Sequence, residues 1–236
     1  MLCFSPSIDD AVSRLAPQFR ALSIVVENAR VSHPEIGPEM LADACQQVRE
    51  GLPAWAEDHI AAWNDVYKAF GAKPKRTPCS AEALIKRVQR DGAISPIDPV
   101  VDLYNAISIR YALPVGGENL CAYSGQPRLT VARGDEPFDV IKDGEPVIEH
   151  PLAGEVIWRD DRGVTCRRWN WRQGVRTRLS AENDKMWFIL ESLPAMPVDA
   201  LYAAGEAMTN GLAAMMPGAN IEMRPFGHFP QENTEE

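Results

Sequence analysis

The first ninety-four residues of the chain carry apolar side chains mainly at helical spacing. In residues 41–48 and again in 55–70, apolar positions recur three or four residues apart, which predicts two amphipathic helices. A third helix is expected to begin at Ser80, as its N-cap, and to end at Asp91-Gly92, because serine favours N-caps and glycine favours helix ends. The short β-branched run at 21–26 predicts a strand before these helices.

From residue 95 the pattern changes to one helix followed by strands. Asp98-Pro99 is typical of a helix start, and the apolar face that follows it predicts a helix to about Ala112. Gly116 and Gly117 predict a turn at 114–119, where glycine permits a positive φ or a close backbone approach. Strands are predicted at 128–132, 154–158, 164–169, 186–191 and 221–224, with a further helix at 198–215.

The fold class that this pattern predicts is α/β (α+β). We expect a mainly helical N-terminal part, residues 1–94, packed on a core at 95–224 that has a mixed β-sheet or barrel-like centre. Residues 225–236 are acidic and are expected to form a flexible tail. At 236 residues the chain is long enough to bury a substantial core, and we expect one compact unit.

Composition narrows the function classes. The formal net charge of -9 argues against broad binding along nucleic acid, so no DNA partner is expected, although a local contact with an RNA end is compatible with it. No apolar run is long enough for a membrane span and the start has no secretory pattern, so a cytoplasmic location is expected. The five cysteines form no CxxC pair, the four histidines show no ligand spacing, and no Walker or GxGxxG loop occurs. Neither a metal nor a cofactor is predicted.

One segment of this acidic chain is strongly basic. Residues 159–178 contain seven arginines against two aspartates, interleaved or flanked with Trp158, Trp169 and Trp171. Guanidinium groups bind phosphates and carboxylates, and indole faces stack on rings, so the segment is a candidate site for an anionic ligand or an RNA end. An edge strand whose arginine stems cover packed tryptophans would have the same composition. Both interpretations stay open.

The helix predicted after Asp98 and the glycine segment after it supply further polar candidates. Asn105 and Ser108 lie beside the apolar face of that helix, where they either bind a ligand or are satisfied by neighbouring backbone. Glu118 follows the glycine pair and is, taken alone, typical of a solvated carboxylate.

Taken in order, several segments resemble the free-standing relatives of the editing domain of the bacterial phenylalanyl-tRNA synthetase beta subunit. The segments are 101–120 (VDLYNAISIRYALPVGGENL), 128–138 (RLTVARGDEPF), 154–161 (GEVIWRDD) and 166–173 (CRRWNWRQ). The resemblance to the synthetase covers residues 95–192, and that to the free-standing relatives reaches back to about residue 73. In the synthetase this domain, described as the fused third and fourth domains, hydrolyses tyrosine wrongly attached to the phenylalanine tRNA.

The resemblance implies a stand-alone, editing-like domain that hydrolyses misacylated aminoacyl-tRNA or a related aminoacyl ester. The chain has no synthetase class signature, so it is not expected to be an amino acid-tRNA ligase. The alternative is a non-catalytic module of the same fold that binds an RNA end, an amino acid or a nucleotide. Asn119 stands where relatives carry an acidic residue, and residues 169–174 replace a glycine-rich turn with an acidic residue, so tyrosine specificity does not follow.

The implied partner is a tRNA or an aminoacyl-tRNA end, and no catalytic residue is assigned. Asn105 and the glycine backbone would shape the pocket, Glu118 or Gln173 would contact the amino acid, and the arginines would hold a phosphate or carboxylate. The predicted site residues are Asn105, Ser108, Gly116, Gly117, Glu118, Arg167, Arg168, Asn170, Arg172 and Gln173.

Overall fold

A computed structural model of the protein describes residues 4–229. The helices are α1 (Asp10–Leu15), α2 (Ile36–Glu50), α3 (Ala56–Ala69), α4 (Ser80–Asp91), α5 (Pro99–Tyr111) and α6 (Val198–Met215), with a short 3-10 turn η1 at Leu120–Ala122. The strands are β1 (Ser7–Ile8), β2 (Arg20–Glu27), β3 (Val115–Asn119), β4 (Arg128–Val131), β5 (Phe138–Lys142), β6 (Glu145–Glu149), β7 (Val156–Arg159), β8 (Val164–Arg167), β9 (Arg172–Gln173), β10 (Lys185–Ser192) and β11 (Asn220–Gly227).

Two open sheets form the centre of the molecule. One has four strands in the order β11-β2-β10-β3, and the other has five in the order β1-β4-β7-β8-β9. The mixed α/β class predicted from the sequence is confirmed, and within residues 4–229 none of the sheets closes into a barrel. Strands from both sides of residue 95 build the four-stranded sheet, because β2 pairs with β10 and with β11.

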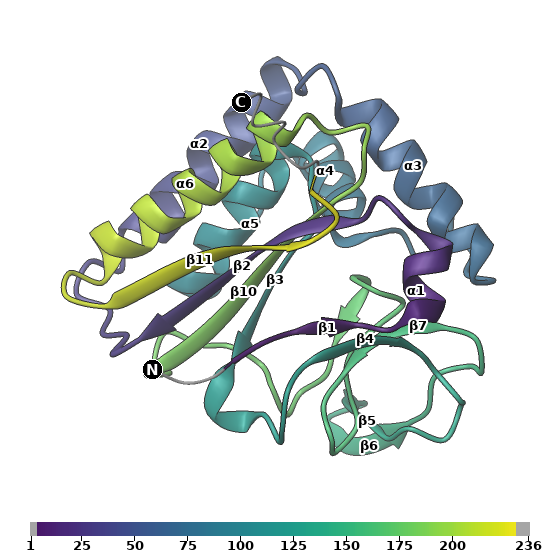
Figure 1. The fold of residues 1–236 in the computed structure, drawn as a ribbon. Coiled ribbons are helices and arrows are strands. Elements are labelled where there is room, and N and C mark those ends of the chain that lie inside the picture. Colours follow the sequence, from purple (N-terminus) through teal and green to yellow (C-terminus); the bar gives the residue numbers. More distant parts are fainter. Residues whose placement is uncertain (1–3, 230–236) are drawn as a thin grey trace, which may run out of the picture.

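The four-stranded sheet is buried on both faces because its central strands alternate between two cores. Met186, Phe188 and Leu190 of β10 pack with α5 and α6 on one face, and Figure 1 shows α2, α5 and α6 gathered on this side. Trp187 and Ile189 point to the opposite face and pack with residues of α3 and of the five-stranded sheet. A candidate site between the two sheets therefore draws on β10 and on β7.

Most predicted helices and strands are confirmed. The helix predicted at 198–215 is α6 with the same bounds, and the Asp98 side chain caps α5 by accepting the backbone N–H groups of Val100 and Val101. Ser80 was predicted to be the N-cap of α4. It is instead the first helical residue, and Cys79 occupies the N-cap position.

The turn predicted at 114–119 is wrong, because these residues form β3, the edge strand beside β10. A Cβ on Gly117 would lie 2.9 Å from atoms of Leu179, Phe188 and Tyr104, so glycine serves close packing here. The sequence allowed two roles for the glycine pair, a positive φ or a close approach of the backbone to other atoms. The close approach is the role that Gly117 has.

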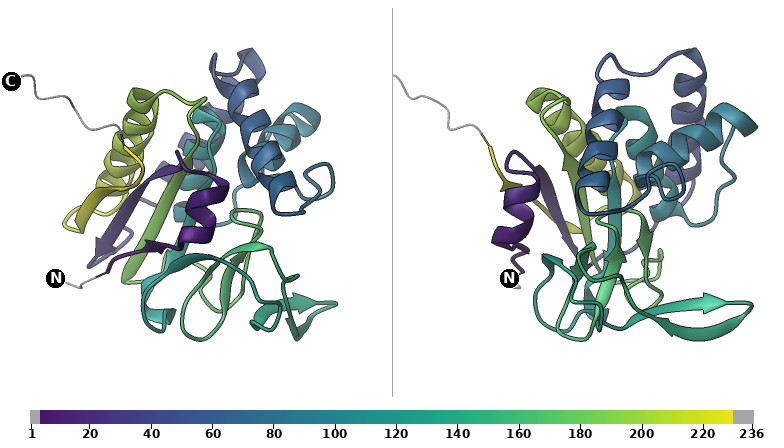
Figure 2. Two further views of the ribbon diagram at one scale, coloured as in Figure 1. Left: turned by 45° about the vertical axis from the view of Figure 1, so that its right-hand side comes forward. Right: turned by 90° about the vertical axis from the view of Figure 1, so that its right-hand side faces the viewer.

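The β5–β6 hairpin was not predicted from the sequence, although residues 142–144 (KDG) at its tip are typical of a turn. It projects from the body of the molecule (Figure 2) and carries exposed Ile141 and Ile148. In residues 4–229 no helix combines the length and the apolar character needed to cross a membrane. The flexible tail was predicted to begin at residue 225, but residues 225–227 form the end of β11 and pair with β2. The part of the predicted tail after Phe229 lies outside the described residues.

Candidate functional site

A cavity of about 280 Å³ lies where α4, α5, β3, the β8–β9 hairpin and β10 meet. Five aromatic residues line it, namely Tyr104, Trp158, Trp169, Trp171 and Trp187. An apolar cavity with a few convergent polar groups is the usual form of a small-ligand site. The volume is near the lower end of that class and suits a compact group such as an amino acid.

The cavity brings together predicted site residues that are far apart in the sequence. Asn105 comes from α5, Gly116 and Glu118 from β3, and a further group from the β8–β9 hairpin, namely Asn170, Arg172 and Gln173. The hairpin is tied to β3 because the Gln173 Nε2 donates to the Gly117 carbonyl at 2.7 Å. One hydrogen bond therefore fixes the relative position of two walls.

Four predicted residues do not line this cavity. Ser108 is buried in α5, where its hydroxyl donates to the Leu113 carbonyl at 2.8 Å, and Gly117 contributes only the carbonyl that accepts from Gln173. Arg167 and Arg168 also lie outside the lining residues.

The two arginines are engaged by an acidic residue. The Arg167 guanidinium forms a bidentate contact with Glu155, at 2.9 and 2.8 Å, and both residues are buried. Arg168 lies 3.6 Å from the same carboxylate, and its guanidinium stacks over Trp171 at 4.4 Å from the ring centre. Arg172, the register partner of Arg167, is exposed and takes part in no ion pair within residues 4–229. Among the predicted arginines it is the one at the cavity.

The sequence did not identify Glu191, which lies on the cavity side of β10 with only 1% of its surface exposed. Its Oε1 accepts from the indole N–H groups of Trp158, at 2.9 Å, and Trp169, at 3.1 Å. Its Oε2 accepts from the Asn170 side-chain amide at 2.9 Å. Burial raises the pKa of Glu191 to about 7, although these three donors act in the opposite direction.

Asn170 connects this carboxylate to the helical part of the molecule. Its Oδ1 accepts from the Tyr67 hydroxyl of α3 at 2.7 Å, and its carbonyl accepts the backbone N–H of Ser80 at 3.1 Å. The two residues before it, Arg168 and Trp169, have left-handed φ values of 47° and 65°. Such backbone costs on the order of 1 kcal/mol for each non-glycine residue, so the surrounding contacts must hold it in place.

Glu118 is the second buried carboxylate of the cavity. The Tyr123 hydroxyl donates to its Oε2, and 5% of the residue is exposed. Desolvation raises the pKa of Glu118 to about 7, and the hydrogen bonds from Tyr123 and Gln173 and the charge of Arg176 only partly oppose this.

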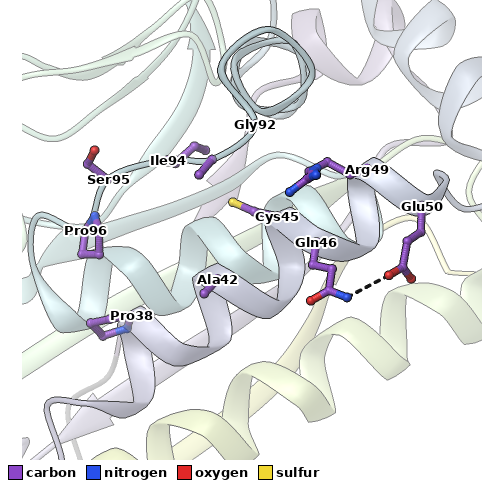
Figure 3. A pocket seen from close by; sticks show the side chains of 11 residues that line it. Pro38, Ala42, Cys45, Gln46, Arg49, Glu50, Gly92, Ile94, Ser95 and Pro96 are labelled. Atoms are coloured by element: carbon purple, nitrogen blue, oxygen red, sulfur yellow. Dashed lines mark hydrogen bonds between the residues drawn. The ribbon is translucent and has the colours of Figure 1, made fainter.

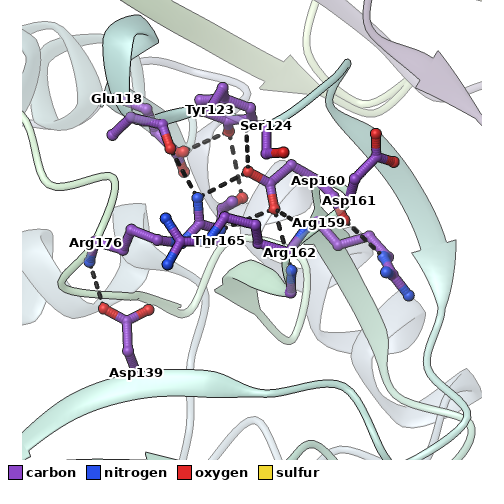
Figure 4. A network of polar contacts seen from close by, with 12 residues as sticks. Glu118, Tyr123, Ser124, Asp139, Arg159, Asp160, Asp161, Arg162, Thr165 and Arg176 are labelled. Atoms are coloured by element: carbon purple, nitrogen blue, oxygen red, sulfur yellow. Dashed lines mark hydrogen bonds and ion pairs between the residues drawn. The ribbon is translucent and has the colours of Figure 1, made fainter.

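A polar network beside Glu118 is shown in Figure 4. Arg176 binds both oxygens of Asp160 at 2.8 Å and donates to the Ala122 carbonyl. Asp160 also accepts backbone N–H groups from Ser124, Arg162 and Gly163. Its carboxylate is therefore fully satisfied by the chain and does not line the aromatic cavity.

A larger hollow of about 740 Å³ lies between α2 and the segment after α4 (Figure 3). It is open, and its Gln46 and Glu50 side chains bind each other at 2.9 Å. None of the predicted site residues lines it. The aromatic cavity is the better candidate because buried titratable groups converge there. The described part of the chain contains no group of three or more His, Cys, Asp or Glu side chains placed to hold a metal.

Comparison with known proteins agrees with this location. The family model of the B3/4 domain matches residues 62–201, a range that includes every residue lining the cavity. The match covers more than half of the chain, so this protein belongs to the B3/4 domain family. The resemblance to the phenylalanyl-tRNA synthetase beta subunit found in the sequence is confirmed at this level.

Among solved structures, the chain is similar to an N-terminal fragment of the phenylalanyl-tRNA synthetase beta-subunit from Pyrococcus horikoshii. The TM-score is 0.47 with 9% identity, over 96% of this chain and 55% of that one. The chain thus spans about half of the length of that fragment. Among curated proteins there is no significant match.

Proposed function

We propose that this protein is an editing-like deacylase that hydrolyses misacylated aminoacyl-tRNA or a related aminoacyl ester. The observation that carries the proposal is the aromatic cavity inside the B3/4 match, with buried carboxylates within it and a free arginine at its rim. In this proposal the aminoacyl group enters the cavity, and Arg172 receives the phosphate or carboxylate outside it.

Such a reaction does not require a nucleophilic side chain. Ester hydrolysis proceeds when one water and the ester are held in position, with the terminal ribose hydroxyl assisting, and each well-placed oxyanion donor is worth about 3 kcal/mol. Three amide side chains line the cavity, and because Asn170 is engaged by Tyr67 and Glu191, Asn105 and Gln173 are the two proposed for this positioning. The Cys166 thiol also lines it, but burial raises its pKa well above the usual range, so it is protonated and a poor nucleophile.

A basic surface near the cavity supports an RNA partner. Lys73, Lys75 and Arg76 are exposed in the loop between α3 and α4. Lys73 and Arg76 line a hollow of about 320 Å³ together with Arg168, which stacks on Trp171 of the cavity wall. In this proposal a phosphate backbone leading to the cavity would contact these cations.

The second candidate function is a binding module that uses the same cavity without hydrolysis. It is favoured by the lining itself, which contains no histidine and only a protonated thiol. Both candidates require the same ligand contacts, so only turnover separates them.

The decisive experiment is a single-turnover deacylation screen against a panel of mischarged tRNAs, run beside free aminoacyl esters. We expect turnover on at least one tRNA, a strong loss in Arg172→Ala, and unchanged turnover in Arg162→Ala, which removes an exposed arginine of the same segment. Absence of wild-type turnover on every substrate, with binding retained, would favour the binding module.

A further inference from the structure

The aromatic cavity contains two buried carboxyl groups to which no cation of the described chain is bonded. Glu118 and Glu191 both line it, and within residues 4–229 neither takes part in an ion pair. Burying a carboxylate is costly unless a partner compensates for the lost hydration. Two other buried carboxylates have such partners, since Asp160 binds Arg176 and Glu155 binds Arg167, whereas Asp102 of α5 has no ion pair among the described residues. The cavity is thus electrostatically complementary to a cation.

The aromatic lining is compatible with the same kind of ligand, because aromatic rings attract ammonium groups. The Trp171 ring already holds a cation in this way, the guanidinium of Arg168. The Ser80 Oγ, which is buried and has no hydrogen-bond partner in the described chain, lies at a residue of the lining and adds an acceptor. Both oxygens of Glu191 accept from neutral donors, at 2.9 to 3.1 Å. Glu118 accepts from the Tyr123 hydroxyl at Oε2, with the Gln173 amide as a further neutral donor. We take Glu118 as the direct partner of a cation because Oε1 is not the atom that the Tyr123 hydroxyl binds.

The charge at the rim has the opposite sign. Arg172 is exposed, lines the mouth and is free of ion pairs among residues 4–229. A ligand that satisfies both ends carries an ammonium group inside and an anion outside, which is the charge pattern of an aminoacyl group attached to a phosphodiester end.

We infer that the cavity recognises the free ammonium group of its aminoacyl ligand through Glu118, with Glu191 adding negative charge beneath the tryptophans. This inference rests on the proposed function of the same cavity and adds a selection to it: amino groups that are blocked by acylation are rejected. Replacing the ammonium by a neutral amide would leave the buried carboxylate without its cation.

The test uses tryptophan fluorescence, since four tryptophans line the cavity. Methylammonium, isobutylammonium and phenethylammonium are titrated against their neutral N-acetyl derivatives. We expect at least one ammonium ligand to bind roughly tenfold or more tightly than its neutral partner, as for loss of a charge-assisted hydrogen bond. Equal binding within each pair, or binding of none, overturns the inference with the wild-type protein alone.

Two variants locate the effect. Glu118→Gln should abolish the difference between ammonium and neutral ligand, and Glu206→Gln, which changes an exposed glutamate on α6, should keep it. Thermal melts of both variants check that they are folded. A folded Glu118→Gln protein that still discriminates would assign the cation to another group and overturn the role of Glu118.

A substrate pair separates this inference from the proposed function. If the protein deacylates aminoacyl-tRNA and its N-acetylated form equally fast, the ammonium selection is wrong and the hydrolase proposal stands. If it discriminates ammonium ligands in fluorescence but hydrolyses no tRNA substrate, the selection stands and the hydrolase proposal is wrong.

Discussion

Two buried acidic centres of this protein, Asp160 and Glu191, are satisfied in different ways. Asp160 is fully buried and binds both terminal nitrogens of Arg176 as well as backbone N–H groups. Glu191 is equally buried but receives only neutral donors, two indoles and one amide. Desolvation acts on both, yet the pKa of Asp160 is lowered, with the Arg176 hydrogen bonds outweighing burial, whereas that of Glu191 is raised to about 7.

The difference separates a structural carboxylate from one that is available to a ligand. A guanidinium in place completes the charge balance of Asp160, so nothing is left for a ligand to add. Neutral donors orient Glu191 without neutralising it. Glu118 likewise has no bonded cation among residues 4–229, and the charge of Arg176 only partly offsets its burial. A buried carboxylate without a cation in an aromatic cavity is thus a better guide to function than the number of arginines nearby.

The largest effect is expected from breaking the ion pair between Asp160 and Arg176. Arg176→Met leaves Asp160 buried without its cation and should lower the free energy of unfolding by about 3–5 kcal/mol. Urea denaturation at pH 7 measures it. Arg162→Met, which changes an exposed side chain beside the same network, should alter stability by less than about 0.5 kcal/mol. A loss below about 1 kcal/mol in Arg176→Met would contradict the structural role.

The second effect is the pH dependence of the free energy of unfolding, which comes from Glu118 and Glu191. The pKa of Glu118 rises from 4.5 to about 7 on folding, and so does that of Glu191, so between these values the folded state binds more protons than the unfolded state. The free energy of unfolding should therefore fall as pH rises from about 4.5 to 7, by up to about 3 kcal/mol for each carboxyl. Asp160 has the opposite effect on stability. Its pKa is lowered in the folded state, so the free energy of unfolding falls when the pH drops below the usual pKa of an aspartate.

Denaturation curves at several pH values test this sign. Glu118→Gln should flatten part of the decline between pH 5 and 7.5, and Glu206→Gln should leave it unchanged. The charged or titratable groups facing the two carboxyls are Arg176, Tyr123, Tyr104, Tyr67, Cys79 and Cys166. Burial raises the pKa of each of these tyrosines and cysteines, and that of Arg176 is raised as well, so none of the six titrates in this window. A slope that is unchanged in Glu118→Gln would place the titration elsewhere.

The same contrast explains what the sequence predicts well. Helices and strands follow from local periodicity, so α5 and α6 were predicted closely. The glycine pair was read as a turn because its true constraint, Gly117 against Tyr104 and Phe188, comes from distant residues. In the sequence Arg167, Arg168 and Arg172 are equivalent candidates, and only folding shows that Glu155 engages the first two.

Glu191 shows the limit of sequence reasoning most directly. It follows a run of apolar residues in β10, and its partners Trp158 and Trp169 lie in other parts of the chain. One local feature of the sequence points to it. Glu191 lies four positions after Trp187, on the same face of a strand that is buried along most of its length, and it is charged. Such a residue must find donors inside the protein, but the sequence does not specify which donors.

The third effect concerns the free arginine at the rim. Arg172→Ala should weaken binding of an anionic aminoacyl ligand by about 1.5–3 kcal/mol, the range for hydrogen bonds to charged groups. Stability should change by less than about 0.5 kcal/mol because the side chain is exposed. Arg172→Lys should recover only part of the affinity, since lysine lacks the planar fork. Isothermal titration beside a thermal melt measures both quantities, and a lowered melting temperature with unchanged affinity would assign Arg172 to packing.

The smallest effect on stability is expected at Asn119, the position where the sequence resemblance implies an acidic residue. Its Oδ1 accepts the backbone N–H of Cys121 at 3.0 Å, a contact that an aspartate oxygen reproduces, so Asn119→Asp should change the free energy of unfolding by less than about 0.5 kcal/mol. The residue does not line the cavity, and its neighbour Glu118 already supplies the carboxylate there. Ligand affinity should therefore change by less than about threefold, because an added charge outside the cavity is screened by solvent. A tenfold or larger gain in affinity or turnover would show that the acidic residue of the relatives acts on the site from this position, and that the two-carboxylate description of the cavity is incomplete.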